Sequence, residues 1–324
     1  MFDSKFFDNV SSKRILVTGD IMLDKFYYAN LNKFSSDAPI PVAKIARRTS
    51  SPGGAANVAR CISALGCSPL LAGFVGSDHN CESLLEQLVA NKIPLETLVY
   101  SDHPTHTKIR VIAKNHQVFR LDFDDDTPYQ ENLFDKLISM IHDKLNRSLD
   151  ALVLADYEKG VCTERFCQTV ISDAHSHGTP VIVLPYGSNW IKYQHADFIV
   201  PNISKLNRIL LSPVDPSDDD ACLSAAHYVR RKFDIRTVFA TRSQFGLTLA
   251  SSGDVGLHFP TRKILLNDPA GAADASCAAS SIAIANGSNL KSAALLSNIV
   301  GGIAVSKPGS YAPTVADVLE AEAG

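Results

Sequence analysis

The sequence predicts an α/β protein built on a doubly wound, mostly parallel sheet that is flanked by helices and carries a small β lid. Two observations lead to this fold class. Short, almost wholly apolar runs alternate along the chain with longer segments of helical periodicity, as expected for strands that are buried on both faces of a parallel sheet. Two further segments interrupt that rhythm, one with a run of aromatic residues and the other with alternating polar and apolar residues, which predicts strands outside the main sheet.

The expected central strands are short and rich in β-branched residues. They lie at residues 14–18 (RILVT), 151–155 (ALVLA), 180–184 (PVIVL), 198–200 (FIV) and 237–241 (TVFAT). Because nearly every position in these runs is apolar, we expect helices to cover both faces of the sheet.

Helical patterns occupy the intervals between these runs. The expected helices lie at residues 55–65, 81–92, 131–147, 163–177 and 219–233. The first and the fourth are followed by Gly66 and Gly178, and glycine is a common stop signal there because it adopts the left-handed conformation without strain. Strands that alternate with helices predict parallel pairing.

The two irregular segments, residues 25–44 and 107–123, are expected to form the lid. The second alternates in β fashion around a turn at residues 114–116. Pro39 and Pro41 indicate an edge position for the first, since proline cannot donate a hydrogen bond to a sheet. We expect the lid to cover a ligand cleft and to pair with the lid of a second copy in a homodimer.

Length and composition indicate a globular protein that acts on small molecules. The 324 residues are 45% hydrophobic and 20% charged, with a formal net charge of −3. This balance gives no basic surface for nucleic acid, and the sequence has neither a signal-peptide run nor an apolar stretch of about 18 residues for a membrane. We interpret residues 1–324 as one domain in the cytoplasm, with no nucleic-acid or membrane partner.

The cysteines and histidines do not indicate a metal centre or a disulfide framework. The seven cysteines are odd in number, scattered, and lack any CxxC pair. The histidine pairs His103/His106 and His175/His177 have no cysteine or carboxylate at matching spacing. No metal ligand is therefore assigned.

Two glycine-containing clusters are candidates for ligand binding. Gly19 and Asp20, with Asp24, follow the first expected strand, and α/β sheets bind ligands beyond the carboxyl ends of their strands; a plain strand-ending turn is the alternative. Gly53 and Gly54 open a helix, where glycine permits close approach of the backbone and the helix N-terminus offers free amides. An ordinary glycine-rich turn is the alternative for this second cluster.

A third cluster, residues 267–274 (NDPAGAAD), precedes an expected helix of small residues at 275–286. Free amides and the helix dipole at such an N-terminus form an anion hole suited to a transferring phosphoryl group. Asp274 in the first turn is placed to accept a proton from an attacking hydroxyl, and a carboxylate that only complements the helix dipole is the alternative.

Taken together, in this order and spacing, the clusters resemble the ribokinase-like (PfkB) carbohydrate kinases from about residue 14 to residue 314. Within that family the chain is most similar to bacterial D-glycero-D-manno-heptose 7-phosphate kinases. The matching segments are GDIMLDKFYY (19–28), SSDAPIPVAK (35–44), PGGAANVA (52–59), TKIRVIAKNHQVFRLDF (107–123), DYEKG (156–160) and TRSQFG (241–246). The resemblance implies transfer of the γ-phosphoryl group of ATP, with Mg²⁺, to the anomeric hydroxyl of a heptose 7-phosphate or similar sugar phosphate, in ADP-heptose and lipopolysaccharide precursor synthesis.

The resemblance also implies roles for individual residues. Asp274 corresponds to the catalytic base, and the anion hole corresponds to Gly271, Ala272 and Ala273. The residues implied for the sugar hydroxyls are Asp24, Gly53, Gly54 and Asn57. Those implied near the remote phosphate are Lys108, Arg110 and Arg120, for which ordinary solvated cations are the alternative. Asp156 and Lys159 are implied near the reacting phosphates, and the nucleotide side is implied for Asn202, Lys205, Thr241, Arg242, Gly246 and Asn298.

Four positions depart from the family pattern, and all lie in the phosphoryl and nucleotide half. Lys205 replaces the glutamate of Asn-x-x-Glu, which helps to organise magnesium; Leu184 and Tyr186 replace the acid and the lysine of Asp-Pro-Lys-Gly; and Ala273 replaces the second glycine of Gly-Ala-Gly-Asp. Three hypotheses stay open. The first is a kinase for a heptose 7-phosphate or similar sugar phosphate, in which Lys205 could contact phosphate in place of the missing lysine. The second is a sugar-phosphate-binding paralogue with weakened or no catalysis, and the third is a kinase for another substrate such as a nucleoside or fructose phosphate.

Overall fold

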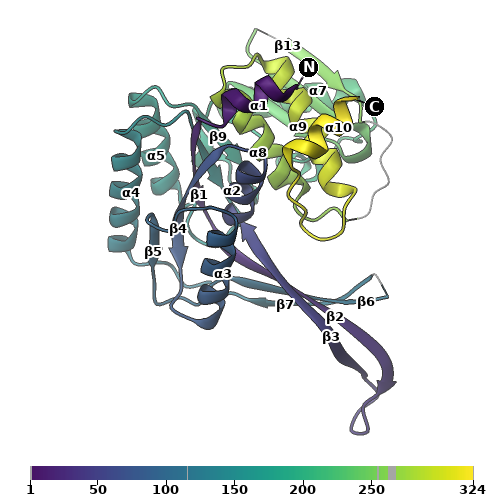
Figure 1. The fold of residues 1–324 in the computed structure, drawn as a ribbon. Helices are drawn as coiled ribbons and strands as arrows, with labels where there is room; N and C mark the ends of the chain where they lie inside the picture. The colour runs from purple at the N-terminus through teal and green to yellow at the C-terminus, as the bar shows by residue number, and fades with distance from the viewer. Residues whose placement is uncertain (1, 115, 254, 262–267, 324) are drawn as a thin grey trace.

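The structure of the chain is a computed structural model that describes residues 2–114, 116–253, 255–261 and 268–323. A nine-stranded sheet runs through its centre in the order β13-β12-β11-β10-β9-β8-β1-β4-β5 (Figure 1). Its strands are β1 (Arg14–Gly19), β4 (Ser68–Val75), β5 (Leu98–Tyr100), β8 (Ala151–Ala155), β9 (Val181–Leu184), β10 (Phe198–Ile199), β11 (Thr237–Thr241), β12 (Leu247–Ser251) and β13 (Val255–Phe259). The pairs from β5 to β11 are parallel, and β12 and β13 add an antiparallel edge.

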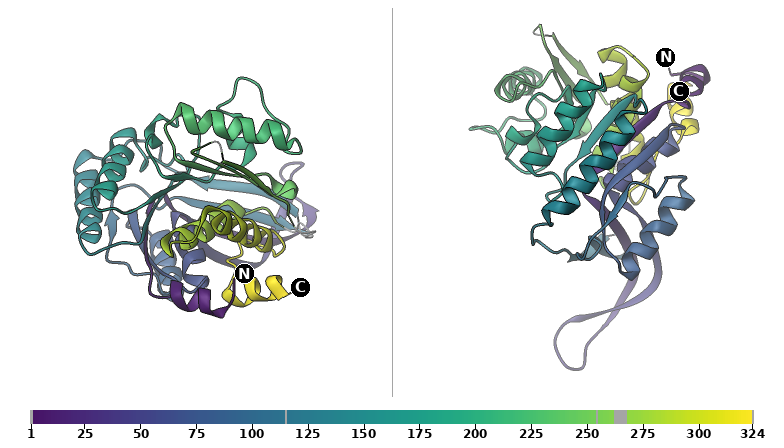
Figure 2. Two further views of the ribbon diagram at one scale, coloured as in Figure 1. Left: turned by 90° about the horizontal axis from the view of Figure 1, so that it is seen from above. Right: turned by 90° about the vertical axis from the view of Figure 1, so that its left-hand side faces the viewer.

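Helices cover both faces of this sheet (Figure 2). One face packs against α1 (Ser4–Val10), α2 (Ala55–Ala64), α3 (His79–Ala90), α8 (Ala272–Ala285), α9 (Leu290–Val305) and α10 (Val315–Ala323). The other face packs against α4 (Glu131–Leu145), α5 (Glu164–Ser176), α6 (Ile203–Asn207) and α7 (Asp219–Lys232). Successive residues of β1 enter opposite cores, with Val17 in the first and Leu16 in the second, which is why the central strands are apolar throughout.

The fold class predicted from the sequence is confirmed. The five expected strands and the five expected helices between them are found within two residues at each end. The helix expected at residues 275–286 begins three residues earlier, at Ala272, so that Asp274 lies inside it. In the described part of the chain, no helix is both long enough and apolar enough to cross a membrane.

A second sheet projects from the main body, as the lower part of Figure 1 shows. Its order is β3-β2-β6-β7, with β2 (Ile21–Phe34), β3 (Pro41–Gly54), β6 (Thr107–Ala113) and β7 (His116–Phe123). The expected lid segment 25–44 covers only the outer part of the β2–β3 hairpin, which begins at Ile21 and returns to Gly54. The lid strands therefore start at the first candidate cluster and end at the second, because the hairpin joins them directly.

Candidate functional site

Asp274 lies in the first turn of α8, where it is buried between residues from two other parts of the chain. The Nδ2 atom of Asn57 donates a hydrogen bond of 2.5 Å to Oδ2 of Asp274, and the Tyr157 hydroxyl donates to Oδ1. Burial raises the pKa of Asp274 above its ordinary value, while these two hydrogen bonds and the charge of Lys205 oppose the rise. The carboxylate is thus both desolvated and oriented, as a proton acceptor needs to be.

The glycine pair at the end of β3 allows the lid to approach the helix that holds Asn57. A Cβ atom at Gly54, which has a φ of 58°, would lie 2.3 Å from the carbonyl oxygen of Asp20. A Cβ atom at Gly53 would lie 2.9 Å from Oδ2 of Asp24. Gly54 is required by its positive φ and the nearby backbone oxygen, whereas a side chain at Gly53 would force the Asp24 carboxylate to move. Asp24, the glycine pair, Asn57 and Asp274 consequently form one continuous set of neighbours.

The cations expected near a remote phosphate share one face of the lid. Strand register places Asp24 beside Lys108, Lys108 beside Asp122, and Arg110 beside Arg120, and directly opposite residues in a sheet point to the same side. Nη1 of Arg110 donates a 2.5 Å hydrogen bond to Oδ1 of Asp24. Nε of Arg120 donates to Asp122 over 2.8 Å, and Lys108 Nζ is 3.8 Å from the same carboxylate. Three cations and two carboxylates give this face an excess of positive charge.

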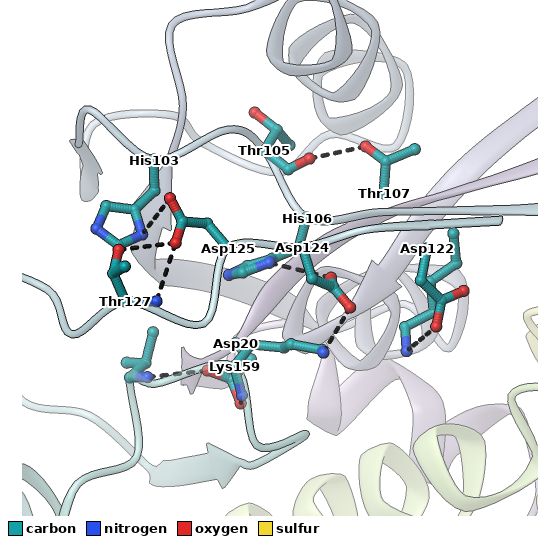
Figure 3. Close-up of polar contacts among 12 residues, drawn as sticks. Asp20, His103, Thr105, His106, Thr107, Asp122, Asp124, Asp125, Thr127 and Lys159 are labelled. Atoms are coloured by element: carbon teal, nitrogen blue, oxygen red, sulfur yellow. Dashed lines mark hydrogen bonds and ion pairs between the residues drawn. The ribbon is translucent and has the colours of Figure 1, made fainter.

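Asp20 fixes the loop that carries Tyr157. Its buried carboxylate accepts backbone N–H groups from Tyr157 at 2.7 Å, Lys159 at 3.1 Å and Val161 at 3.0 Å, and Figure 3 includes its bond to Lys159. Burial and the nearby charge of Asp156 raise the pKa of Asp20 to about 6, against the lowering effect of the three hydrogen bonds. The end of β1 therefore holds the loop in place by direct backbone contacts.

Asp156 and Lys159 are both engaged with protein partners. Asp156 accepts a 2.5 Å hydrogen bond from the Tyr193 hydroxyl and forms an ion pair with Lys192. Lys159 Nζ donates to Oδ2 of Asp124 over 2.6 Å, which ties the loop to the base of the lid (Figure 3). Both residues lie in the loop that follows β8 and that Asp20 holds in place. Their contact with the reacting phosphates stays a prediction.

Three of the four departures from the family pattern lie on adjoining segments that follow β9 and β10. Leu184 is buried at the end of β9, and the ring of Tyr186 stacks on that of Tyr157 with centroids 6.4 Å apart and planes 30° apart. Lys205 Nζ donates to the Pro185 carbonyl over 2.7 Å and lies 5.1 Å from the centre of the Tyr186 ring. We call Tyr157 and Tyr186 the tyrosine stack. Contacts run from Lys205 through this stack to Asp274.

Ala273 does not distort the anion-hole turn. The left-handed position there is Gly271, which caps α8 with a φ of 79°, whereas Ala273 lies in the helix and packs against the core. The first residue of the motif, Asn267, lies outside the described residues, and Asp268 accepts the N–H groups of Ala270 and Gly309. A helical backbone is open to alanine, so Ala273 fits this position without backbone strain.

Residues predicted for the nucleotide side cap or brace backbone segments. Asn202 caps α6 by accepting the Lys205 N–H over 2.8 Å, and it forms a β-bridge with Thr241. Asn298 donates to the carbonyls of Phe259 and Pro260. These contacts place Asn202, Thr241 and Asn298 near the carboxyl ends of β10, β11 and β13. Direct contact of these residues with a nucleotide stays a prediction.

Arg242 and Gly246 shape the turn after β11. The Arg242 guanidinium is only 2% exposed, and it donates to Asp219 over 2.6 Å and to the carbonyls of Pro216 and Phe245. Gly246 has a φ of 88°, and a Cβ atom there would lie 1.9 Å from the Phe259 carbonyl oxygen. Protein acceptors thus take Nη1 and Nη2 of Arg242, while its buried Nε has no hydrogen-bond partner in the described part of the chain, so Arg242 braces this turn through its two Nη atoms.

The residues around Lys205 suit phosphate better than a protein-bound magnesium ion. Burial lowers the pKa of Lys205, and the negative charges of Asp274 and Asp156 oppose that shift. Magnesium takes oxygen ligands, usually one or two carboxylates. The ammonium group stands where the family has its glutamate, and Asp156 is already paired with Lys192. A phosphate fits both this cation and the amides at the start of α8.

Sequence reasoning missed two side chains that act on the site. Tyr157 had no assigned role although it lies between Asp156 and Lys159 in a matched segment, and Asp20 was linked only to a turn or ligand edge. Both were visible as residues next to assigned ones. Their partners, Asp274 and the backbone of residues 157–161, are distant in sequence, so only the fold reveals them.

Comparison with known proteins gives one family match and several long relatives. The pattern of the pfkB family carbohydrate kinases matches residues 12–317. The bifunctional protein HldE of Chromohalobacter salexigens is 34% identical over 312 residues, which cover 95% of this chain and 63% of that protein. HldE of Shewanella denitrificans is 35% identical over 300 residues, covering 92% and 61%. The chain spans about three fifths of the length of these relatives.

Solved structures with the same fold are more distant in sequence. Phosphofructokinase-2 from Escherichia coli, in complex with potassium, superposes with a TM-score of 0.78 at 18% identity and covers 96% of this chain and 98% of its own. Ribokinase from Thermotoga maritima gives a TM-score of 0.73 at 19% identity, covering 96% and 100%. These likenesses establish the fold alone.

Proposed function

Because the chain belongs to the pfkB family of carbohydrate kinases, we propose that it transfers the γ-phosphoryl group of ATP to the anomeric hydroxyl of a heptose 7-phosphate or a similar sugar phosphate. The resemblance predicted from its motifs is thereby confirmed at the level of the family. The step would belong to ADP-heptose and lipopolysaccharide precursor synthesis. The related HldE proteins are bifunctional and longer, so both the substrate and the pathway are part of our proposal.

The observation that carries this proposal is the position of Asp274. It lies at the N-terminus of α8, beside Asn57 and within reach of the charge of Asp24. Burial brings the pKa of Asp274 upward, towards the pH at which a general base works best. As the sugar oxygen bonds to the γ-phosphorus, the bond from that phosphorus to the leaving oxygen of ADP breaks, and Asp274 takes the hydroxyl proton.

The remaining side chains of the site would contact the two ends of the sugar. Asn57 keeps the carboxylate of Asp274 turned towards the cleft, and Asp24 offers an acceptor for a second sugar hydroxyl. The positive lid face, with Lys108, Arg110 and Arg120, suits the phosphate at the far end of the sugar. The three cations exceed the two carboxylates that pair with them by one charge, which supports a phosphorylated substrate.

The groups opposite the lid suit the negatively charged phosphates of ATP. The free amides at the start of α8 and the ammonium group of Lys205 would hold its phosphates. Magnesium, which family members use with ATP, would supply charge neutralisation at those phosphates. The residues present do not form a protein-held magnesium site at Lys205, so we assign no ligand from this chain to the ion.

A direct assay tests the proposal. ADP release is measured with heptose 7-phosphate and ATP at several magnesium and manganese concentrations, beside an Asp274→Asn variant as the control. We expect turnover that depends on both substrates and is lost in the variant. Turnover no higher than that of the variant at every metal concentration would exclude the kinase.

A second function is favoured by the contacts of the four departures. Lys205 already donates to Pro185, and the tyrosine stack fills the space beside Asp274, so the chain supports a sugar-phosphate-binding protein without catalysis as the alternative. Calorimetry separates the two readings. A kinase binds both sugar phosphate and ATP with magnesium, whereas the binding protein takes up sugar phosphate alone.

We also propose that the lid pairs two copies of the chain in a homodimer. Strand β7 is an edge strand, and its Phe119, Leu121 and Phe123 are 55%, 49% and 50% exposed. A Phe119→Lys/Leu121→Lys variant should then sediment as a monomer. The control is Val255→Lys on β13, the edge of the other sheet. An unchanged mass for the lid variant would contradict the proposal.

We propose the cytoplasm as the location of the protein, as expected from the sequence, because a kinase that uses ATP would work there.

A further inference from the structure

Far from the candidate active site, three side chains of metal-ligand type meet between α4 and α5. They are His142 on α4, Asp173 on α5, and His177, which caps the C-terminus of α5. One ligand atom of each lies within 4.8 Å of those of the other two, and no other His, Cys, Asp or Glu group in the described part of the chain meets this test. We propose that these residues form a binding site for a divalent transition-metal ion, with Zn²⁺ the best-fitting occupant.

The packing of the two helices brings these groups together. Arg165 on α5 contacts Asp135 on α4 at 2.7 Å, 30 residues apart in sequence, and His142 contacts Asp173 at a separation of 31 residues. The nearly constant offset means that α4 and α5 run parallel, so their C-terminal ends lie side by side. The C-terminus of a helix carries partial negative charge. Two such ends at one place favour a bound cation.

The distances between the ligand atoms suit a small ion. His142 Nδ1 is 3.0 Å and 3.1 Å from the two carboxylate oxygens of Asp173, and His177 Nδ1 is 3.4 Å from Oδ1. Ligands at 2.0–2.2 Å around a tetrahedral zinc ion are separated from each other by roughly 3.3 Å. Both histidines therefore already have nearly the required spacing to Asp173, while the two histidine ligand atoms lie within 4.8 Å of each other and would move closer around the ion. The ion would replace the hydrogen bonds that now join the side chains.

A fourth residue supports the orientation of one ligand. The Nε2 atom of His177 lies 3.1 Å from Oδ1 of Asn146, the residue that caps α4. With Nδ1 on the metal, Nε2 carries the proton and donates it to this oxygen. Metal-bound histidines usually have such a partner on the second ring nitrogen. In the ion-free chain Nδ1 of His177 lies 2.8 Å from the Asp173 carbonyl oxygen, which can only accept a hydrogen bond. The ion would replace that bond, and Asn146 would stabilise the tautomer with the proton on Nε2.

The site is accessible from solvent. A groove of about 730 Å³ runs between the two helices, and His142 and Asp173 line it. The ion could enter by this groove and keep water in its fourth position. Two imidazoles and one carboxylate favour zinc, cobalt or nickel over magnesium.

Sequence reasoning paired His177 with its neighbour His175 and found no metal ligands. In the fold, His175 Nε2 instead lies 2.9 Å from Asp197, while His177 lies beside His142 of the other helix. The ligands come from two different helices, so the spacing of residues along one helix does not reveal the site.

Calorimetric titration of the full chain with ZnCl₂, in millimolar MgCl₂ after removal of metals, tests the proposal. We expect the His142→Ala/His177→Ala variant to lose one zinc equivalent relative to the unmodified chain. The control is His79→Ala, which removes an exposed histidine that contacts a single carboxylate, Glu82 at 2.9 Å. Co²⁺ should give the visible absorption of a tetrahedral ion in the unmodified chain and not in the double variant.

Two further measurements keep the result decisive. Zinc should raise the Tm of the unmodified chain by roughly 3–6 °C at a hundredfold excess over Kd, and it should not raise that of the double variant. Asn146→Ala keeps all three ligands and should weaken zinc binding about tenfold, which decides the question if the double variant does not fold. Equal zinc stoichiometry in the unmodified chain and the double variant, or unchanged affinity in Asn146→Ala, would overturn the proposal.

Discussion

The two sides of the candidate cleft hold similar polar groups but use them in different ways. On the lid side, Asp24 and Asn57 keep the identities expected of the family, and their contacts lead towards Asp274. On the opposite side, Tyr186 and Lys205 replace the expected residues and contact each other. These two replaced residues therefore pack as one set, so a change at one of them alters the surroundings of the other.

The largest expected effect is at Asp274, where the two sides meet. Asp274→Asn keeps the size of the side chain but removes the proton acceptor, so we expect turnover to fall by about 10³-fold. The affinity for sugar phosphate should change by less than roughly threefold, since most contacts of the lid side remain. ADP release and calorimetry measure the two quantities. Retained turnover would mean that another group accepts the proton.

Restoring the family residues on the altered side tests whether that side limits the rate. The triple variant Tyr186→Lys/Lys205→Glu/Ala273→Gly should raise kcat by about 10²-fold if the changes there weaken phosphoryl transfer. Lys205→Glu alone should not, because it places a negative charge near Asp274 while Tyr186 still stacks on Tyr157. A triple variant that keeps its Tm but gains no rate would place the cause elsewhere.

A smaller, one-sided effect is expected on the lid. Arg110→Met removes the cation that pairs with Asp24, so we expect the KM for sugar phosphate to rise about tenfold while the KM for ATP stays unchanged. Lys44→Met, at an exposed position on β3, is the matched control. Equal changes in both KM values would show that the lid face does not act on one substrate alone.

The smallest expected effect concerns the pH dependence. Asp274 must be ionised to accept a proton, and the hydrogen bond from Tyr157 lowers its pKa. Tyr157→Phe removes that bond, so the pKa of Asp274 should rise and the acid limb of kcat/KM should move to higher pH. The loss of activity near neutral pH should be at most about tenfold. A limb that stays in place or moves to lower pH would separate Tyr157 from the base.

The sequence predicted the parts of the fold whose pattern is local. β1 and β8 are buried on both faces, so their residues read as continuous apolar runs. β5 has only three residues, and β13 is a partly exposed edge strand, so neither gives a clear period. The start of α8 was placed late because Ala272 and Ala273 are small residues without helical amphipathicity.

The site was predicted by residue type, and its contacts were not. A glycine in a tight turn and an acid at a helix N-terminus can be predicted from the sequence, because each depends on residues adjacent to it in the chain, as at Gly54 and Asp274. The partners of Lys159 and Arg242 are distant in sequence, and which carboxylate each one finds depends on the packing of whole elements. The sequence therefore identifies the long cationic side chains of such a motif, but it does not predict which groups they contact.

The carboxylate of Asp20 has a consequence for how such a protein diverges. Three amides of the loop at residues 157–161 depend on this one side chain, which lies between β1 and β2 at the start of the lid. Leu184 and Tyr186 take part in none of these three bonds. The position of this loop therefore depends on the junction of β1 and β2 and not on the two replaced residues at the end of β9, so Asp20 holds the loop independently of changes there.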